Sequence, residues 1–499
     1  MNINIIHNLP FFTIFLAMLG GILTALINDK RKALKLNQFI ILVVFAMSLI
    51  LLINVYQNQE TFTFMMGHFP APWGNELRAG PLEALMTTFF SLVMFITVSA
   101  GKKEIFEDIV EDKIKYFFIM LNLIFGSILA LIYTNDVFTS YVFIEINTIA
   151  SCAVIMAKSH GRSIAASIHY LIMASLGSGL FLIGLTMLYD ITGHLLMPNI
   201  QESLIALAQS GEYRMPLIVV TGLIFIGLSI KSALFPFHTM LPNAYDSSTG
   251  SSAGILSGLV LKSYIMLIIK FIYQVYSLEV FTSLGMNNIY FIFGILGMIF
   301  GSLFALKEVR IKKMLAYSSV AQIGYIFMGI GFGTYYGIAA ACFHMLAHAC
   351  TKTALFASVG QLQEVNHKKN WIKDLRGTGR FHPVAGLTYT VAAFSMVGFP
   401  FLAGFASKYF FAIATGYNRT RLTIVIIALA ISMILNALYF IPTVISIWSM
   451  PKDNSLLVKP VVPISQKLYL LAFVVINFTL GIFFNEFMKV ILLGIDLLG

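Results

Sequence analysis

The chain has 499 residues, of which 58% are hydrophobic and only 11% are charged, against about a quarter charged in ordinary soluble domains. This composition excludes a soluble enzyme and a soluble core held by a single anchor. The formal charge of +10 is compatible with nucleic-acid binding, but membrane topology accounts for it, as shown below. The three cysteines fall in apolar segments without paired spacing, which excludes a disulfide framework and favours packing roles: Cys152, Cys342 and Cys350.

Apolar runs of about 20 residues, the length that crosses a bilayer, recur from one end of the chain to the other. They predict an all-α, polytopic membrane protein with about fourteen transmembrane spans. The predicted spans are 9–27, 38–56, 80–100, 115–134, 136–157, 165–189, 216–238, 253–276, 288–306, 313–332, 335–360, 382–413, 421–448 and 466–487. The first run has no basic stretch before it and no small-residue cleavage site after it, so we expect a retained helix instead of a removed signal.

Basic residues gather in alternate loops between these spans, around 30–35, 102–115, 307–313 and 368–380. The intervening loops hold few. The positive-inside rule places the basic loops in the cytoplasm and both termini on the outer side of a cell inner (cytoplasmic) membrane. Most of the net charge is then an orientation signal, and we expect the lipid bilayer, and no nucleic acid, as a partner.

Glu145 is a charged residue in the middle of the predicted span 136–157. The later spans contain five lysines: Lys231, Lys262, Lys270, Lys352 and Lys408. A lysine at the centre of a bilayer costs about 2.5–3.5 kcal/mol even on the lenient insertion scale. We expect Lys270 to snorkel to an interface, and Lys352 can do the same. For Glu145 and the other three lysines, a functional role is the favoured interpretation.

The span 216–238 carries Lys231, Pro236 and His238, and a proline inside a helix removes a backbone donor and clashes one turn back. We therefore expect this helix to break beside Lys231. Pro400 predicts a second break in 382–413, ahead of Lys408. Backbone opened at membrane depth is tolerated only in a protein interior or beside water.

His344, His348 and Lys352 are spaced i, i+4, i+8, so one helix face presents all three. Imidazole titrates near neutral pH, and each group lies about one turn from the next, so such a face can pass protons. A metal site is the competing interpretation of the histidine pair. It is disfavoured because no carboxylate lies nearby in the sequence, and we expect no metal. A lone packed histidine accounts poorly for three polar residues in register.

The triplet Phe-Pro-Phe occurs at both predicted breaks, five spans apart. This recurrence predicts a duplicated five-helix unit, inverted because the number of helices is odd. The predicted divisions are the first three helices in 1–109, the two repeats in 110–280 and 281–450, and a last helix in 451–499.

Four longer stretches carry a resemblance to a known family: KSALFPFHTMLP (231–242), GILSGLVLKSY (254–264), KMLAYSSVAQIGY (313–325) and DLRGTGR (374–380). With them, roughly residues 110–415 resemble the antiporter-like subunits shared by Mrp-type Na⁺/H⁺ antiporters, respiratory complex I and membrane-bound hydrogenases. That family's plan of fourteen helices with inverted five-helix repeats matches the plan predicted above.

The resemblance implies that Glu145 and Lys231 are the family's glutamate–lysine pair and that Lys262 is its connecting lysine. Lys408 matches the terminal charged residue. Either His344 or His348 matches the relay histidine. His238, Lys352 and Lys270 are secondary candidates.

Two departures from the family pattern bear on which branch of that family the chain resembles. PNAYDSSTG (242–250) replaces the usual Pro-Asp/Asn-Ala-His followed by Ala-Pro, which puts the role of this loop in question. Lysine at 408, where one complex I homologue has glutamate, favours the Mrp-like or hydrogenase-like branches. The sequence has no long carboxy-terminal extension with a lateral helix, which argues against the largest subunit type.

These observations predict an ion-translocating membrane subunit that relays protons along buried Glu, Lys and His side chains, with other integral membrane subunits as partners. The chain has no flavin, nucleotide or Fe–S signature, so we expect no cofactor and no catalytic chemistry of its own. A stand-alone transporter of an organic solute is the alternative, and a di-iron membrane enzyme lacks the further histidine clusters it needs. The sequence leaves open H⁺ against Na⁺, the direction of transport, and the choice among antiporter, hydrogenase and complex I-like complexes.

Overall fold

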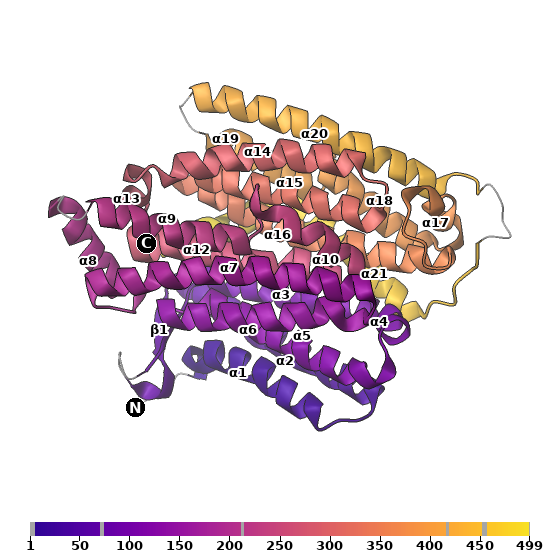
Figure 1. Ribbon diagram of the computed structural model, residues 1–499, viewed down its shortest axis with the longest axis horizontal. Coiled ribbons are helices and arrows are strands. Elements are labelled where there is room, and N and C mark those ends of the chain that lie inside the picture. Colours follow the sequence, from indigo (N-terminus) through magenta and orange to yellow (C-terminus); the bar gives the residue numbers. More distant parts are fainter. Residues whose placement is uncertain (1–4, 70–73, 211–213, 416–418, 452–456, 499) are drawn as a thin grey trace.

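The computed structural model describes residues 5–69, 74–210, 214–415, 419–451 and 457–498. The chain forms a bundle of long helices that run largely along one direction, from α1 (Leu9–Ala25) and α2 (Lys30–Asn58) at one flank to α20 (Arg419–Trp448) at the other (Figure 1). Both termini lie toward the same end of the bundle.

Among the described residues, 11 helices are long and apolar enough to cross a membrane. They are Ile6–Ala25, Lys30–Asn58, Pro81–Ala100, Glu111–Tyr133, Val137–Lys158, Gly161–Thr192, Arg214–Lys231, Gly250–Tyr276, Met286–Lys307, Arg419–Trp448 and Ile464–Ile482. The other three predicted spans also coincide with helices, namely α15 (Ile311–Gly331), α16 (Tyr335–Val365) and the pair α18 (Pro383–Val397) and α19 (Ala403–Ala414).

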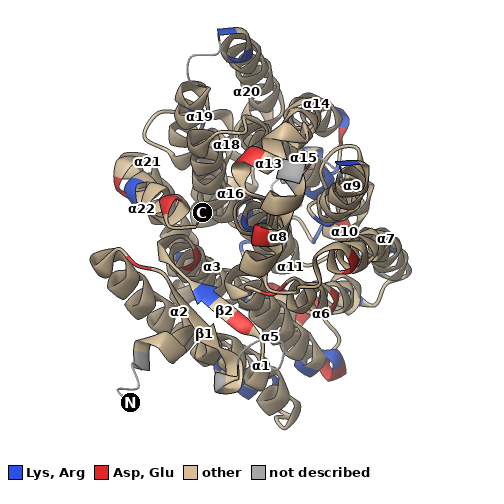
Figure 2. Cartoon of the chain, turned by 90° about the vertical axis from the view of Figure 1, so that its left-hand side faces the viewer, with Lys and Arg blue, Asp and Glu red and all other residues tan. Residues whose placement is uncertain are grey.

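The amino-terminal part adds a feature that the sequence did not predict. Strands β1 (Phe62–Met65) and β2 (Glu76–Ala79) pair antiparallel, with Phe62 opposite Ala79, between α2 and α3 (Pro81–Ala100). A short helix, α4 (Lys102–Asp108), follows α3 at the opposite end of the bundle. Seen from the end with the hairpin, the bundle is mostly tan, and β2 carries both an acidic and a basic segment (Figure 2).

The middle of the chain contributes one of the completely buried segments of the bundle. Helices α5 (Glu111–Tyr133), α6 (Val137–Ile155), α7 (Gly161–Thr192), α8 (Met197–Ser210) and α9 (Arg214–Lys231) come first. The continuous segment 250–276 follows as α11 (Gly250–Ile255), the π-helical turn η5 (Leu256–Val260), α12 (Leu261–Lys270) and a second π-helical turn, η6 (Phe271–Tyr276). This segment is fully buried, and α16 packs against α11, α15, α18 and α19.

Two helices end near the predicted proline breaks. Helix α9 ends at Lys231, and after a short 3₁₀ turn, η4 (Phe237–Met240), the next helix is α10 (Leu241–Ser247). Helix α18 ends at Val397 and α19 begins at Ala403, so Pro400 lies between them. The residue before a proline avoids the helical region, which fits helices that end ahead of each proline.

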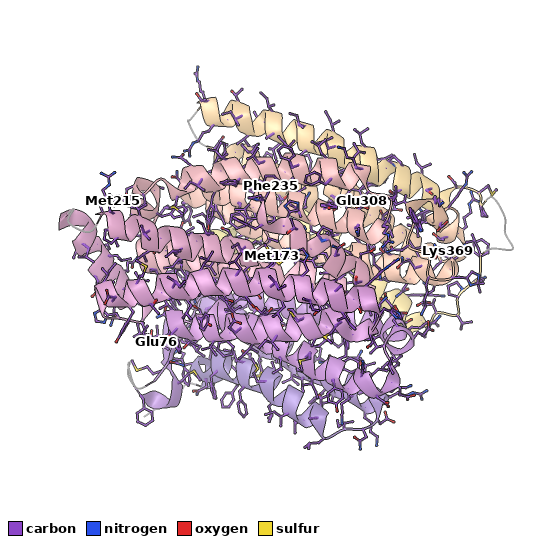
Figure 3. The ribbon with its side chains drawn as sticks, in the orientation of Figure 1. Glu76, Met173, Met215, Phe235, Glu308 and Lys369 are labelled. Carbon is purple, nitrogen blue, oxygen red and sulfur yellow. The ribbon has the colours of Figure 1, made fainter. Side chains whose placement is uncertain are left out.

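The remaining elements complete the second half of the bundle. They are α13 (Leu278–Ser283), α14 (Met286–Lys307), η7 (Ile372–Leu375), α17 (Thr378–Phe381), α21 (Ile464–Ile482) and α22 (Phe484–Asp496). Figure 3 places Glu308 and Lys369 toward one end of the bundle and Glu76 and Met215 toward the other, with Phe235 between them. The basic loops around 307–313 and 368–380 therefore share one end, as alternate loops of a spanning bundle do.

Candidate ion pathway

The glutamate–lysine pair predicted from the sequence meets in the structure. Lys231, the last residue of α9, is 2% exposed, and its Nζ lies 3.9 Å from Oε1 of Glu145 on α6. The ammonium donates a hydrogen bond of 2.6 Å to the hydroxyl of Thr148, one turn further along α6. Glu145 is partly exposed on the flank of the bundle, and its Oε1 accepts no hydrogen bond in the structure. The carboxylate thus lies close to the lysine without a direct hydrogen bond to it.

Hydroxyl and amide groups continue from this pair toward α12. Asn147, next to Thr148 on α6, accepts a 3.0 Å hydrogen bond from the phenol of Tyr264 and donates one of 2.7 Å to Ser127. Tyr264 lies two residues after Lys262. All of these groups are buried, and none was singled out in the sequence, because their partners come from segments far apart along the chain.

Lys262 is fully buried and donates to the backbone carbonyl of Ser257 in the π-helical turn η5. A π turn displaces the regular i→i−4 pattern and is frequent at functional sites. The hydroxyl of Ser257 also lies 2.9 Å from that of Ser319 on α15. No carboxylate among the described residues forms an ion pair with Lys262, so its ammonium has only neutral oxygen to hold it.

The two histidines of α16 stack as their spacing predicts, with ring centroids 6.0 Å apart and an angle of 11° between the rings. Both are buried. Nδ1 of His344 lies 2.9 Å from the hydroxyl of Ser407 on α19, whereas neither ring nitrogen of His348 has a hydrogen-bond partner. Within the part of the chain that the structure describes, no group of three or more His, Cys, Asp or Glu side chains could hold a metal ion.

Lys408 on α19 lies at the far side of this pair. Its ammonium donates to the carbonyls of Met396 (2.7 Å) and Val397 (2.8 Å), which are freed because α18 ends there. The turn passes through Gly398 at φ 106°, and a Cβ at this position would lie 3.0 Å from Nζ of Lys408. The helix interruption therefore supplies both the acceptors and the room for the lysine, and only glycine meets both demands.

The expectation that Lys270 and Lys352 snorkel to an interface is wrong, because both are fully buried. Lys352 donates to the carbonyl of Leu315 at 2.9 Å and to the hydroxyl of Ser318. Lys270 donates to the carbonyls of Ile132 (3.0 Å) and Thr134, at the end of α5. The position of Lys270 near the end of its span suggested an accessible interface, but the hairpin and the start of α3 cover that end.

A buried ion pair accompanies Lys270 at this end. Glu83 in the first turn of α3 is fully buried and lies 3.0 Å from Nη1 of Arg78 on β2. Its second oxygen has no hydrogen-bond partner among the described residues. The sequence could have pointed to Glu83, because it places this carboxylate near the start of the predicted span 80–100.

His238 is buried among aromatic side chains. Its ring stacks on Phe235 at 5.3 Å and on Phe304 at 5.8 Å, and its Nδ1 has no hydrogen-bond partner. These ring neighbours are aromatic side chains, and the geometry does not join His238 to the line from Lys231 to Lys408.

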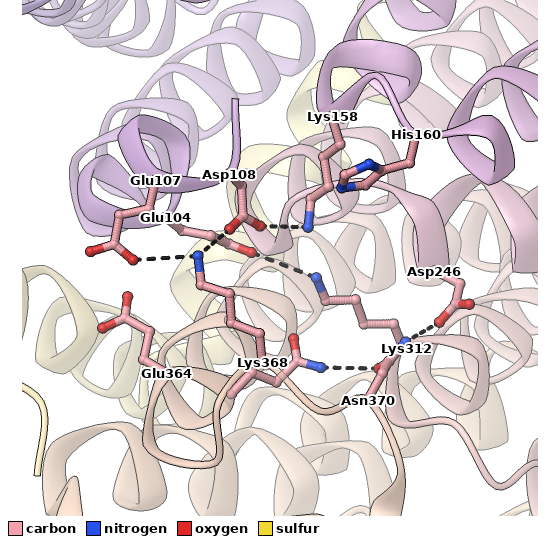
Figure 4. A pocket seen from close by; sticks show the side chains of 12 residues that line it. Glu104, Glu107, Asp108, Lys158, His160, Asp246, Lys312, Glu364, Lys368 and Asn370 are labelled. Atoms are coloured by element: carbon pink, nitrogen blue, oxygen red, sulfur yellow. Dashed lines mark hydrogen bonds and ion pairs between the residues drawn. The ribbon is translucent and has the colours of Figure 1, made fainter. Parts of the chain in front are cut away.

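A charged pocket with a cavity of about 450 Å³ lies at the end of the bundle that carries the basic loops (Figure 4). Its lysines, unlike Lys262 and Lys408, pair with carboxylates. These contacts are Lys158–Asp108 at 2.5 Å, Lys368–Asp108 at 2.6 Å, Lys368–Glu107 at 3.4 Å and Lys312–Glu104 at 3.6 Å. Burial alone would raise the pKa of Asp108, but Lys158 and Lys368 together hold that pKa below its ordinary value.

Glu104 of this pocket also reaches the helix that carries Lys262. Its Oε1 accepts a 2.6 Å hydrogen bond from the backbone N–H of Gly250, the first residue of α11. Its Oε2 would lie 2.7 Å from a Cβ at Gly360, so the Glu104 side chain packs closely against α16 at this glycine. The pocket was not predicted, because its residues come from separate segments of the chain.

Comparisons with known proteins agree with this architecture. Residues 134–435 match the family model described as NADH:quinone oxidoreductase/Mrp antiporter, transmembrane. The chain is 29% identical to NADH-quinone oxidoreductase subunit N from Desulforudis audaxviator, over 85% of this chain and 83% of the relative. It is 27% identical, over 86% of its length and 84% of the relative, to a Na⁺/H⁺ antiporter subunit from Alkalihalophilus pseudofirmus.

Solved structures with similar folds come from multi-subunit membrane complexes. A chain of the Mrp complex from Dietzia superposes with a TM-score of 0.87 at 20% identity, covering 99% of this chain and 97% of that one. A chain of the archaeal membrane-bound sulfane sulfur reductase superposes with a TM-score of 0.85 at 24% identity, with the same coverage. At these identities the structural likeness shows the fold.

Proposed function

The chain belongs to the NADH:quinone oxidoreductase/Mrp antiporter transmembrane family, and on that premise we propose that it relays protons along its line of buried lysines and histidines. The single observation that carries this proposal is the pair of Lys231 and Glu145, at 3.9 Å and without a hydrogen bond between them. A nearby carboxylate favours the protonated lysine, and loss of that influence favours proton release. The pair is thus suited to hold a proton and to give it up.

The proposed route connects the groups described above. A proton released by Lys231 passes along the buried hydroxyl and amide groups around Asn147 and Tyr264 to Lys262. From there the stacked histidines His344 and His348 carry it to Lys408. The hydroxyl of Ser407, the residue before Lys408, lies 2.9 Å from His344, which supports this last step.

The partners of the proposed subunit are other integral membrane subunits, with H⁺, Na⁺ or both as the transported ions. Glu145 supports the presence of partner subunits, because a partly exposed carboxylate in the middle of a span is costly against lipid. A neighbouring subunit on this flank would cover it and would also supply the charge movement that loosens its hold on Lys231. The named relatives are subunits, which does not favour a stand-alone transporter of an organic solute.

The finer architecture is part of the same proposal. We infer fourteen spans, with α15, α16 and the interrupted pair α18–α19 added to the 11 strongly apolar helices. Residues 1–109 and 451–499 would flank two inverted repeats, 110–280 and 281–450. The positive-inside rule puts the end with the basic loops in the cytoplasm and both termini outside the cell inner membrane.

Glu145→Gln tests this function most simply, with Glu145→Asp as the matched control that keeps the charge. Each variant is purified in its native complex, reconstituted into vesicles, and assayed for H⁺ and Na⁺ movement under separately imposed gradients. We expect Glu145→Gln to lower the rate by about 10²–10⁴-fold, the usual contribution of a positioned acid or base, while Glu145→Asp retains part of it. An assembled Glu145→Gln complex with the wild-type rate would contradict the proposal.

A further inference from the structure

A second pocket, which shares Asp246 with the charged pocket of Figure 4, opens beside α7, α10 and the start of α15. Its cavity measures about 520 Å³, within the range of ordinary ligand sites. The side chains that line it include three cationic or titratable groups without a counter-ion: Arg162, His169 and Lys313. None of the three forms an ion pair with a described residue.

The other charges of this pocket cancel one another. The carboxylate of Asp246 lies 2.7 Å from Nη1 of Arg310 and accepts a further hydrogen bond from Asn370. Asp246 is therefore already satisfied and does not neutralise the three free groups. The pocket has an excess of positive charge, and its ligand should be an anion.

The flank of α7 below the pocket is apolar and uncovered. Ala165 and His169 line the pocket, and Ile172 (62% exposed) and Leu176 (53% exposed) follow at steps of three and four residues on the same face. From Ala165 to Leu176 the helix rises about 17 Å, roughly half of a hydrocarbon core about 30 Å thick. A ligand that fits both parts carries an anionic head and a chain one leaflet long.

We propose that this pocket binds the phosphate headgroup of an anionic phospholipid, with Arg162 and Lys313 as its cationic contacts and the Ile172–Leu176 face of α7 along an acyl chain. Basic pockets between membrane helices on the cytoplasmic side bind such headgroups by this chemistry. The site does not depend on ion transport, so the binding test below stands apart from the transport test of Glu145.

The experiment measures binding of short-chain phosphatidylglycerol to the purified complex after exhaustive detergent washing, by native mass spectrometry. The double variant Arg162→Gln/Lys313→Gln should weaken binding by about thirty-fold, since each basic residue near a membrane surface contributes about 1 kcal/mol. Lys32→Gln/Lys35→Gln is the matched control, because it removes two exposed charges among the basic loops and should leave binding unchanged.

Two further arms fix the identity of the ligand. Ala165→Phe fills the pocket without changing its charge and should also weaken binding, which keeps the test decisive if the double variant assembles poorly. Phosphatidylcholine of the same chain length and inorganic phosphate alone should bind much more weakly than phosphatidylglycerol. Unchanged binding in both pocket variants, equal loss in the control, or equal binding of inorganic phosphate would each overturn the proposal.

Discussion

The buried lysines of the interior and the lysines of the charged pocket are the same residue type in two different electrostatic settings. Lys262 and Lys408 donate to backbone carbonyls, which are neutral acceptors. Lys312 and Lys368, at the end with the basic loops, lie within 4 Å of carboxylates. A neutral acceptor binds an amine in either protonation state, whereas a carboxylate pairs only with the charged one. Lys262 and Lys408 are therefore suited to exchange protons, and the pocket lysines to fasten helices together.

The largest effect that sharpens this comparison is expected at Lys262. Lys262→Met removes the charged group of α12 that lies between the Lys231 pair and the histidines, while methionine fills a similar buried volume. We expect the transport rate to fall by about 10²–10⁴-fold, measured in vesicles and normalised to assembled complex. Met266→Leu, one turn further along the same buried helix, is the control for packing alone and should keep the rate.

The histidine pair offers a smaller and more selective effect. His344 is held by Ser407, whereas His348 has no hydrogen-bond partner and is free to change its protonation state or its rotamer. We expect His348→Phe to slow transport by about 10²-fold or more and Ser407→Ala to slow it only severalfold. Equal, small effects of His348→Phe and His344→Phe would mean that protons bypass this face of α16.

Lys270 should matter less than the central line, although it is buried. Its two acceptors are carbonyls at the carboxy-terminal end of α5. The Lys270 amine can therefore cap this helix whether it is charged or neutral. We expect Lys270→Met to lower transport only severalfold and to lower the thermal stability of the complex. A loss as large as that of Lys262→Met would place Lys270, with Glu83 beside it, on the main route.

Asp108→Asn tests the charged pocket. We expect this variant to leave transport intact and to lower the stability of the folded state. The pKa of Asp108 is lowered by Lys158 and Lys368 against the opposing effect of burial, so its ionised form stabilises the folded state. That stabilisation is fully present above the unfolded pKa near 3.9 and is lost as pH falls through the lower folded pKa. The variant should lose about 1.5–3 kcal/mol at neutral pH, and its thermal unfolding should match that of the wild type more closely at acidic pH.

The sequence predicted the parts of the site that depend on local spacing and on the cost of charge in a membrane. The stacked histidines and the interruption before Lys408 followed from such arguments, whereas the pairing of Glu145 with Lys231 was implied by the family resemblance. The hydroxyl and carbonyl acceptors could not be predicted, because they come from distant segments, as with Asn147 and Tyr264, which lie 117 residues apart. Snorkelling was wrongly expected at Lys270 because a span's end looks exposed until the hairpin and α3 fold over it.

One measurement tests the central claim most directly: transport by complexes that carry Lys231→Met or Lys312→Met. Both lysines are almost completely buried and each lies within 4 Å of a carboxylate, but Lys231 stands beside Glu145 at the head of the proposed line, whereas Lys312 lies beside Glu104 in the charged pocket. Per assembled complex, we expect Lys231→Met to abolish H⁺ movement and Lys312→Met to retain most of it. Equal losses in the two variants, or a functional Lys231→Met complex, would contradict the account.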